Sequence, residues 1–183
     1  ISKVCDSEGV DIACDGKEFT AFCVSAGDGI VCHFFENTYY KNIVREYHST
    51  MPCVALISFD NAEDFFNDSD EAYSEIVASV ETSLQKWAAE YNALYKRVGT
   101  NRYMIIFKDS DIDKMTAAKF PILKTIRSIN ANHLTATISV GLSRGEKLIK
   151  DSEMNARKAL EMALGRGGDQ VAILSNNSYE FFG

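Results

Sequence analysis

The stretch from Leu94 to Phe107, LYKRVGTNRYMIIF, contains two short strand-like runs on either side of a tight turn. The runs are Leu94–Val98 and Tyr103–Phe107, and Gly99 stands where a hairpin turn needs a permissive backbone. Two such strands joined by so short a turn pair antiparallel. The stretch therefore predicts a β-hairpin, and the rest of the fold extends from it in both directions.

The segments on both sides of this hairpin alternate between strand and helix patterns. The other predicted elements are a buried strand at 53–59, helices at about 70–91 and 111–129, a strand at 135–142, a helix at about 152–164, and strands at 170–174 and 178–182. Pro121 should bend or divide the second helix, and Gly165 is a natural C-cap for the third. The order β-α-β-β-α-β-α-β-β predicts an α+β, ferredoxin-like fold with extra elements.

The residues before this unit predict a small antiparallel sheet. Asp15-Gly16 and Asp28-Gly29 are hairpin signals, and the strands that they separate lie at about 9–14, 17–25 and 30–36. A helical connector follows from about Asn37 to Tyr47. Three strands alone cannot close a core, so this part is a fragment of a domain or an appendage docked on the next one. We expect three parts: 1–36, a connector at 37–51, and the main domain at 52–183.

Composition excludes several classes of protein. The 19 basic and 26 acidic side chains leave a net charge of −7, which lacks the driving force that nucleic-acid binders use. No apolar run is long enough to cross a membrane, and Ile1–Val4 resembles neither a start nor a signal peptide, so we expect a piece of a longer protein. The cysteines form an odd set without close pairs: Cys5, Cys14, Cys23, Cys32 and Cys53. They predict free thiols in a reducing, cytosolic compartment, and no zinc site.

Several motifs carry a resemblance to a known family over about 53–183. Arg97–Tyr103 resembles the R-x-G-G-D-E-F hairpin of diguanylate cyclases, and Thr137–Gly141 resembles their T-V-S-I-G strand. Ser58-Phe59-Asp60-Asn61 and the run G-R-G-G-D-Q-V-A-I at 165–173 are similar to a more specific group. That group is the degenerate GGDEF domain of bacterial, membrane-anchored cyclic-di-AMP phosphodiesterases of the GdpP type.

The resemblance implies a fold, an arrangement of domains and a role. The fold is that of GGDEF domains and nucleotide cyclases. Proteins of this group consist of two membrane helices, a PAS domain, this domain and a DHH/DHHA1 catalytic unit. The strands at 1–36 would then be the tail of the PAS domain. The protein would be a homodimer at the cytoplasmic side of the cell membrane, and its phosphodiesterase site would lie outside this chain, which has no Asp-His-His sequence.

The family pattern also implies which residues should perform cyclase chemistry, and most of them are replaced. Ser58 stands at the position of the metal-binding Asp on the first strand, and Arg102 stands at that of the hairpin acid. A hydroxyl and a guanidinium cannot replace two anionic ligands of Mg²⁺, and Arg102 would repel the ion. The phosphate-binding Lys of the third helix corresponds to Met162, and Arg166 alone keeps its type. We therefore expect no diguanylate cyclase activity and no catalytic residues.

A weaker nucleotide site remains as an alternative. Asp60 survives on the same face of the strand as Ser58, where it either holds Mg²⁺ weakly or fixes a turn before the helix. With ATP or GTP, the contacting residues would come from the hairpin turn and from the turn after the third helix: Gly99, Thr100, Asn101, Arg166, Gly167 and Gly168. The competing interpretation of the second turn is a helix C-cap that Asp169 fixes, because a helix C-terminus disfavours anions.

Three functions therefore compete. The first is a regulatory domain that relays a signal from the PAS part to the DHH/DHHA1 unit. The second is weak hydrolysis of ATP or GTP through Asp60 and Arg166. The third is a sensor that binds nucleotide without turning it over. His33, His48 and His133 have no ligand-like spacing to other candidate groups and predict no further site.

Overall fold

The structure is a computed structural model that describes residues 9–68, 70–131 and 133–183. The chain divides into two compact units, Ile1–His48 and Ser49–Gly183. Within the described ranges, no helix is long and apolar enough to span a membrane.

The first unit contains a three-stranded antiparallel sheet in the order β1-β2-β3. The elements are β1 (Val10–Cys14), β2 (Lys17–Ala26), β3 (Gly29–Glu36) and the start of α1 (Thr38–Thr50). The three predicted strands are confirmed, but the second turn is Gly27-Asp28 rather than Asp28-Gly29. Gly29 instead pairs with Ala26, and Gly27 supplies the positive φ of 61° that the turn needs.

The start of α1 is fastened to this sheet by polar contacts. The backbone N–H of Asn37 donates to the Glu18 carbonyl at 2.9 Å, and the Glu18 N–H donates to Thr38 Oγ1 at 2.8 Å. Lys41 forms an ion pair with Asp11 at 2.6 Å. No residue of α1 is buried, and Tyr39 and Tyr40 are largely exposed.

One expectation about the cysteines is wrong, because Cys23 and Cys32 form a disulfide. The two residues are direct partners in the β2–β3 register, with their Cα atoms 4.0 Å apart. Their nine-residue separation therefore reflects the geometry of a hairpin. Cys14 and Cys53 are free, and Cys5 lies outside the described residues. The cysteines consequently no longer support a reducing compartment.

The second unit is built on a six-stranded mixed sheet in the order β11-β10-β9-β4-β6-β5. Its strands are β4 (Pro52–Phe59), β5 (Leu94–Gly99), β6 (Arg102–Lys108), β9 (Ile138–Arg144), β10 (Val171–Ser175) and β11 (Ser178–Phe182). The part β9-β4-β6-β5 is antiparallel throughout, as expected for the ferredoxin-like arrangement. α6 connects β9 to the parallel strand β10, and β11 pairs antiparallel at the edge. The predicted α+β fold is confirmed.

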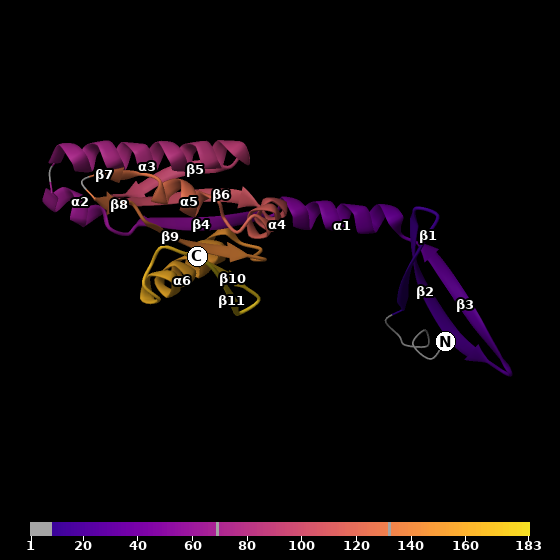
Figure 1. The fold of residues 1–183 in the computed structure, drawn as a ribbon. Coiled ribbons are helices and arrows are strands. Elements are labelled where there is room, and N and C mark those ends of the chain that lie inside the picture. The colour runs from indigo at the N-terminus through magenta and orange to yellow at the C-terminus, as the bar shows by residue number, and fades with distance from the viewer. Residues whose placement is uncertain (1–8, 69, 132) are drawn as a thin grey trace. The chain divides into compact units, whose positions relative to one another are not determined.

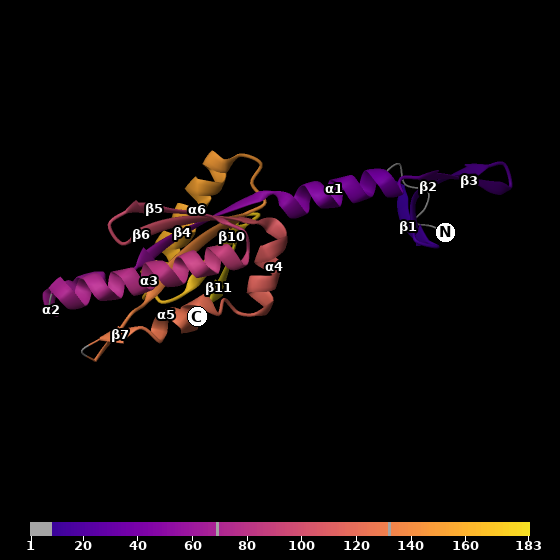
Figure 2. The ribbon, with the colours of Figure 1, turned by 90° about the horizontal axis from the view of Figure 1, so that it is seen from above.

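Helices cover both faces of this sheet (Figures 1 and 2). They are α2 (Ala62–Asp68), α3 (Asp70–Glu90), α4 (Asp109–Ala117), α5 (Ile122–Arg127) and α6 (Ile149–Gly165). The main core lies on the face covered by α3, where Val80, Leu84 and Phe107 are buried. α6 covers the other face, where Ala156 and Leu160 pack against Val54 and Leu56. We call this second surface the α6 face.

Two predicted elements differ from the structure in instructive ways. The helix predicted at about 111–129 is divided at Pro121 into α4 and α5, because proline cannot continue the hydrogen-bond ladder. The strand predicted at 135–142 begins at Ile138, because Thr135 instead belongs to a short pair formed by β7 (Asn130–Ala131) and β8 (Leu134–Thr135).

Gly141 on β9 allows α6 to approach the sheet closely. A Cβ atom at this position would lie 2.1 Å from the Leu160 backbone nitrogen and 2.2 Å from the Ala156 carbonyl oxygen. Only glycine fits this contact without a shift of the helix. Gly141 therefore sets how α6 sits on the sheet, and with it the position of the turn that follows α6.

Candidate functional site

Ser58, Arg102 and Ser139 lie near the end of β4, on the α6 face. Side chains alternate between the two faces along β4: Ile57 and Phe59 belong to the main core, whereas Leu56 lies under α6. Ser58 therefore faces α6, as does Arg102, its direct partner on β6. Ser139 is the partner of Ser58 on the other side, from β9.

These residues do not fit the Mg²⁺ ion of an active cyclase. The two positions that should supply carboxylates are direct cross-strand neighbours, but they carry the hydroxyl of Ser58 and the cation of Arg102. Met162 on α6 is 44% exposed and offers no charge for a phosphate. Across the described ranges, no three Asp, Glu, His or Cys side chains come together in a way that could hold a metal.

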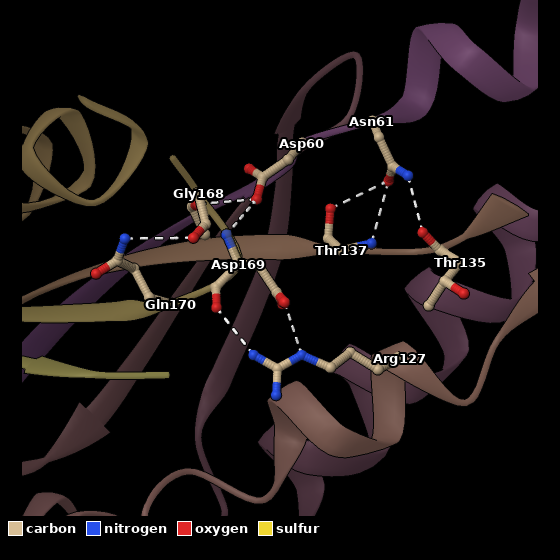
Figure 3. A network of polar contacts seen from close by, with 9 residues as sticks. Asp60, Asn61, Arg127, Thr135, Thr137, Gly168, Asp169 and Gln170 are labelled. Atoms are coloured by element: carbon tan, nitrogen blue, oxygen red, sulfur yellow. Dashed lines mark hydrogen bonds and ion pairs between the residues drawn. The ribbon is translucent and has the colours of Figure 1, made fainter. Parts of the chain in front are cut away.

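Asp60 instead accepts two hydrogen bonds within the fold (Figure 3). Its Oδ2 accepts from Ser139 Oγ at 2.8 Å and from the backbone N–H of Asp169 at 3.0 Å. Its own N–H donates to the Thr137 carbonyl at 2.9 Å. The carboxylate therefore joins the end of β4 to β9 and to the turn after α6. We expected Asp60 to fix the turn before the next helix, but its carboxylate instead binds the turn after α6.

The surroundings of Asp60 are unfavourable for its charged form. Burial raises the pKa of its carboxyl, and the negative charge of Asp169 adds to the increase, while the two hydrogen bonds oppose it. Its second oxygen, Oδ1, is buried without a hydrogen-bond partner among the described residues. Only Oδ2 of the Asp60 carboxylate is thus hydrogen-bonded, and Oδ1 has no partner among the described residues.

The hairpin turn lies beside the same end of β4. Gly99 ends β5, Thr100 is exposed, and Asn101 adopts a left-handed conformation with φ of 56°. The Asn101 carbonyl accepts the N–H of Phe59 at 2.9 Å, and its Oδ1 accepts from Tyr73 of α3 at 3.1 Å. The turn thus contacts the residue before Asp60, and the side chain of Asn101 is engaged with α3.

The backbone N–H groups of the turn after α6 already donate hydrogen bonds to carbonyls of that helix. Gly167 N–H donates to Leu164 O at 3.0 Å and Gly168 N–H donates to Ala163 O at 3.1 Å. This pattern closes a helix C-terminus and offers no ring of free N–H groups to a phosphate. The Arg166 guanidinium lies over the Phe181 ring at 4.2 Å, and a Cβ at Gly168 would come within 2.9 Å of Asp60 Oδ2.

Two further residues complete the polar network in Figure 3: Arg127, which the sequence did not identify, and Asn61, which it identified only as part of a motif. Arg127 at the end of α5 donates to the Asp169 carboxylate at 2.7 Å and to its carbonyl at 3.0 Å. Asn61 accepts the N–H of Thr137 at 3.1 Å and donates to the Thr135 carbonyl at 2.8 Å. Both contacts join residues more than 40 positions apart, so no local pattern indicated them.

The chain is similar in sequence to a known protein family and to characterised proteins. The family described as "Cyclic-di-AMP phosphodiesterase GdpP-like, GGDEF domain" matches residues 57–181. A cyclic-di-AMP phosphodiesterase GdpP from Geobacillus thermodenitrificans is 30% identical over 82% of the chain and 23% of its own length. GdpP from Bacillus subtilis is 31% identical over 85% of the chain and 24% of its own length. The chain thus spans less than a quarter of these relatives.

Solved structures agree on the fold. The GGDEF domain of DgcB from Caulobacter crescentus superposes with a TM-score of 0.59 at 16% identity, covering 73% of this chain and 81% of that one. The GGEEF domain of a diguanylate cyclase from Vibrio cholerae has a TM-score of 0.60 at 15% identity, covering 74% and 91%. At this identity the likeness concerns the GGDEF fold alone.

Proposed function

Because the chain belongs to the family of GGDEF domains of GdpP-like cyclic-di-AMP phosphodiesterases, we propose that it is a regulatory domain without diguanylate cyclase activity. It transmits signals to a phosphodiesterase unit of DHH/DHHA1 type elsewhere in the same protein. The strands of the first unit are then the tail of a PAS domain, and the protein is a homodimer anchored at the cytoplasmic side of the membrane.

The observation that carries this proposal is the cross-strand pair of Ser58 and Arg102. A metal-dependent cyclase needs carboxylates at these two neighbouring positions to hold Mg²⁺ against the triphosphate. A cation in place of one ligand raises the energy of a bound Mg²⁺. The rest of the fold is intact, with buried hydrophobic clusters on both faces of the sheet. The chain thus combines a folded domain with the absence of the cyclase ligands, which favours a role in transmission.

The start of the second unit is built to transmit a displacement. α1 ends at Thr50, directly before the central strand β4. The Met51 carbonyl accepts the N–H of Asp109 at 2.9 Å, and the Asp109 carboxylate accepts two hydrogen bonds from Arg144 at 2.7 and 2.8 Å. Arg144 also binds Asp113 at 2.6 Å. Residues at the entry to β4 are therefore tied to α4 and β9, so that a shift there moves the sheet as a whole.

A cyclase assay tests the first half of the proposal. The purified chain, incubated with GTP or ATP and either Mg²⁺ or Mn²⁺, should yield no cyclic dinucleotide above the level of a heat-treated sample. Robust synthesis by the chain would overturn the proposal.

The second half is tested in the full-length protein through Arg144. Arg144→Ala should change the phosphodiesterase rate or its response to the upstream signal, because it loosens the entry to β4. Lys158→Ala, which removes an exposed cation of α6 that bonds only to Asn155 of the same helix, is the matched control. Equal rates and responses in both variants and the unmodified protein would contradict transmission through this route.

A second candidate function is weak hydrolysis or sensing of ATP or GTP with Mg²⁺. One observation favours it: the Oδ1 of Asp60 has no hydrogen-bond partner among the described residues, and the hairpin turn bonds to the neighbouring Phe59. Asp60→Ala should then abolish metal-dependent nucleotide binding and phosphate release, measured by calorimetry and by a phosphate assay. Release that persists in Asp60→Ala would show that the phosphate comes from another site.

A further inference from the structure

A cleft of about 290 Å³ lies between α6 and the β5–β6 hairpin, and we call it the α6–hairpin cleft. Its floor is apolar: Leu56 of β4 and Leu160 of α6 are buried, and Met104 of β6 is half-buried. Val98, which is 45% exposed, forms part of the wall. Neither Asp60 nor the turn after α6 lines this cleft.

The rim of the cleft carries two arginines and one acid: Arg102 from β6, and Arg157 and Glu153 from α6. Two positive charges and one negative charge leave the rim positive in a chain whose net charge is −7. The backbone of Arg102 pairs within the sheet, but its side chain makes no hydrogen bond or ion pair with any residue that the structure describes. Arg157 contacts Glu153 at 3.0 Å, but both side chains are about half exposed, so this pair is weak and readily exchanged.

This combination points to the chemistry of a ligand. Guanidinium groups bind phosphate through paired, charge-assisted hydrogen bonds. An apolar floor beside them favours a planar or apolar body, and ligand pockets usually measure about 300–1,000 Å³, so this cleft takes a compact molecule. We propose that the α6–hairpin cleft binds an organic monophosphate of the size of a nucleoside monophosphate, with its phosphate on Arg102 and Arg157.

The proposed binding needs no metal, because the arginines themselves neutralise the phosphate. This separates it from nucleotide binding at Asp60, which requires Mg²⁺. It also goes beyond the regulatory function, which holds whether or not the cleft is occupied, so that the two proposals fail independently.

Calorimetric titration of the whole chain with AMP in the presence of EDTA tests the inference. We expect saturable binding that Arg102→Ala and Arg157→Ala each weaken at least tenfold. Lys158→Ala removes a neighbouring positive charge of α6 that does not line the cleft, and it should bind AMP like the unmodified chain. Thermal unfolding of each variant checks that these exposed substitutions leave the fold intact.

Adenosine and inorganic phosphate, each titrated alone, test the two halves of the ligand. Both should bind at least tenfold more weakly than AMP, because each uses only the floor or only the arginines. Four results would overturn the inference: no saturable AMP binding, binding that appears only with Mg²⁺, binding lost in Arg166→Ala while Arg102→Ala retains it, or phosphate binding as tight as that of AMP.

Discussion

Asp60 is a carboxylate whose two oxygens have different surroundings. Oδ2 accepts hydrogen bonds from Ser139 and Asp169, and Oδ1 is buried without a partner among the described residues. Burial raises its pKa above the ordinary value of 3.8. A carboxyl whose pKa is higher in the folded than in the unfolded state binds its proton more tightly when folded. The protonated carboxyl of Asp60 therefore makes its full contribution to the stability of the fold below about pH 3.8, and this contribution is lost as the pH rises through the pKa of the folded state.

The stability of Asp60→Asn should therefore depend less on pH. From about pH 4 upward, the free energy of unfolding of the unmodified chain should fall relative to that of the variant, whose side chain does not titrate. Urea denaturation across this range measures both values. Asp64→Asn, which removes an exposed carboxylate of α2, is the control. Parallel curves for the unmodified chain and Asp60→Asn would contradict the prediction.

Ser58 and Arg102 are direct partners across β4 and β6, so their Cβ atoms are about 4.5–5.5 Å apart. Two carboxylates at these positions would share one cation. The double variant Ser58→Asp/Arg102→Glu should bind Mn²⁺, with each single variant at least tenfold weaker, as measured by paramagnetic resonance. Mn²⁺ should also raise the unfolding temperature of the double variant, because it relieves the repulsion between the new charges. Equal affinities in single and double variants would show that the two side chains do not meet.

At the scale of elements, the contact between α6 and β9 depends on Gly141. Gly141→Ala should destabilise the fold by about 1–3 kcal/mol, because the added methyl group meets the backbone of α6 and cannot be accommodated by a side-chain rotation. Gly165→Ala is the matched control, since no atom lies within 4 Å of the added group. Urea denaturation of both variants checks the difference. A Gly141→Ala protein as stable as Gly165→Ala would mean that α6 shifts without cost.

Arg127 connects α5 to the turn between α6 and β10. Arg127→Ala should cost about 1.5–3 kcal/mol, because it removes the charge-assisted hydrogen bonds to Asp169. Arg127→Lys should be intermediate, since an ammonium group cannot donate to both acceptors in the same plane. The backbone N–H groups of Asp169 and Gln170 should exchange with solvent more slowly in the unmodified chain than in Arg127→Lys, and fastest in Arg127→Ala. Unchanged exchange in Arg127→Ala would show that the turn is held by Asp60 alone.

At the scale of the whole molecule, the chain consists of two units. The hydrophobic clusters found among the described residues lie within the unit Ser49–Gly183, and Phe34 and Phe35 of the first unit are more than half exposed. Residues 49–183 should therefore fold alone, with an unfolding temperature within a few degrees of that of the second unit in the whole chain. Scanning calorimetry of both proteins measures this. Loss of a cooperative transition in 49–183 would show that the second unit depends on the first.

The predicted hairpin, central strand and helices are found in the structure because each depends on patterns within a few residues. Alternation along β6, the apolar run of β4 and the ring of Pro121 act locally. The same holds for the loss of the cyclase ligands, since Ser58 and Arg102 follow from their places in two local motifs. These features can therefore be predicted from the sequence.

Other features depended on which distant residues meet. The disulfide between Cys23 and Cys32 follows from the turn at Gly27-Asp28, which sets the β2–β3 register. The role of Asp60 followed from the packing of α6, which brings Asp169 to its carboxylate, and from Arg127 on α5. The sequence alone determined that the hairpin of this GGDEF domain lacks its acids, because that depends only on which amino acids occupy the turn. The tertiary structure decided that Asp60 accepts hydrogen bonds from Ser139 and Asp169 and that the Arg102 side chain lines a cleft, because such contacts depend on distance in space.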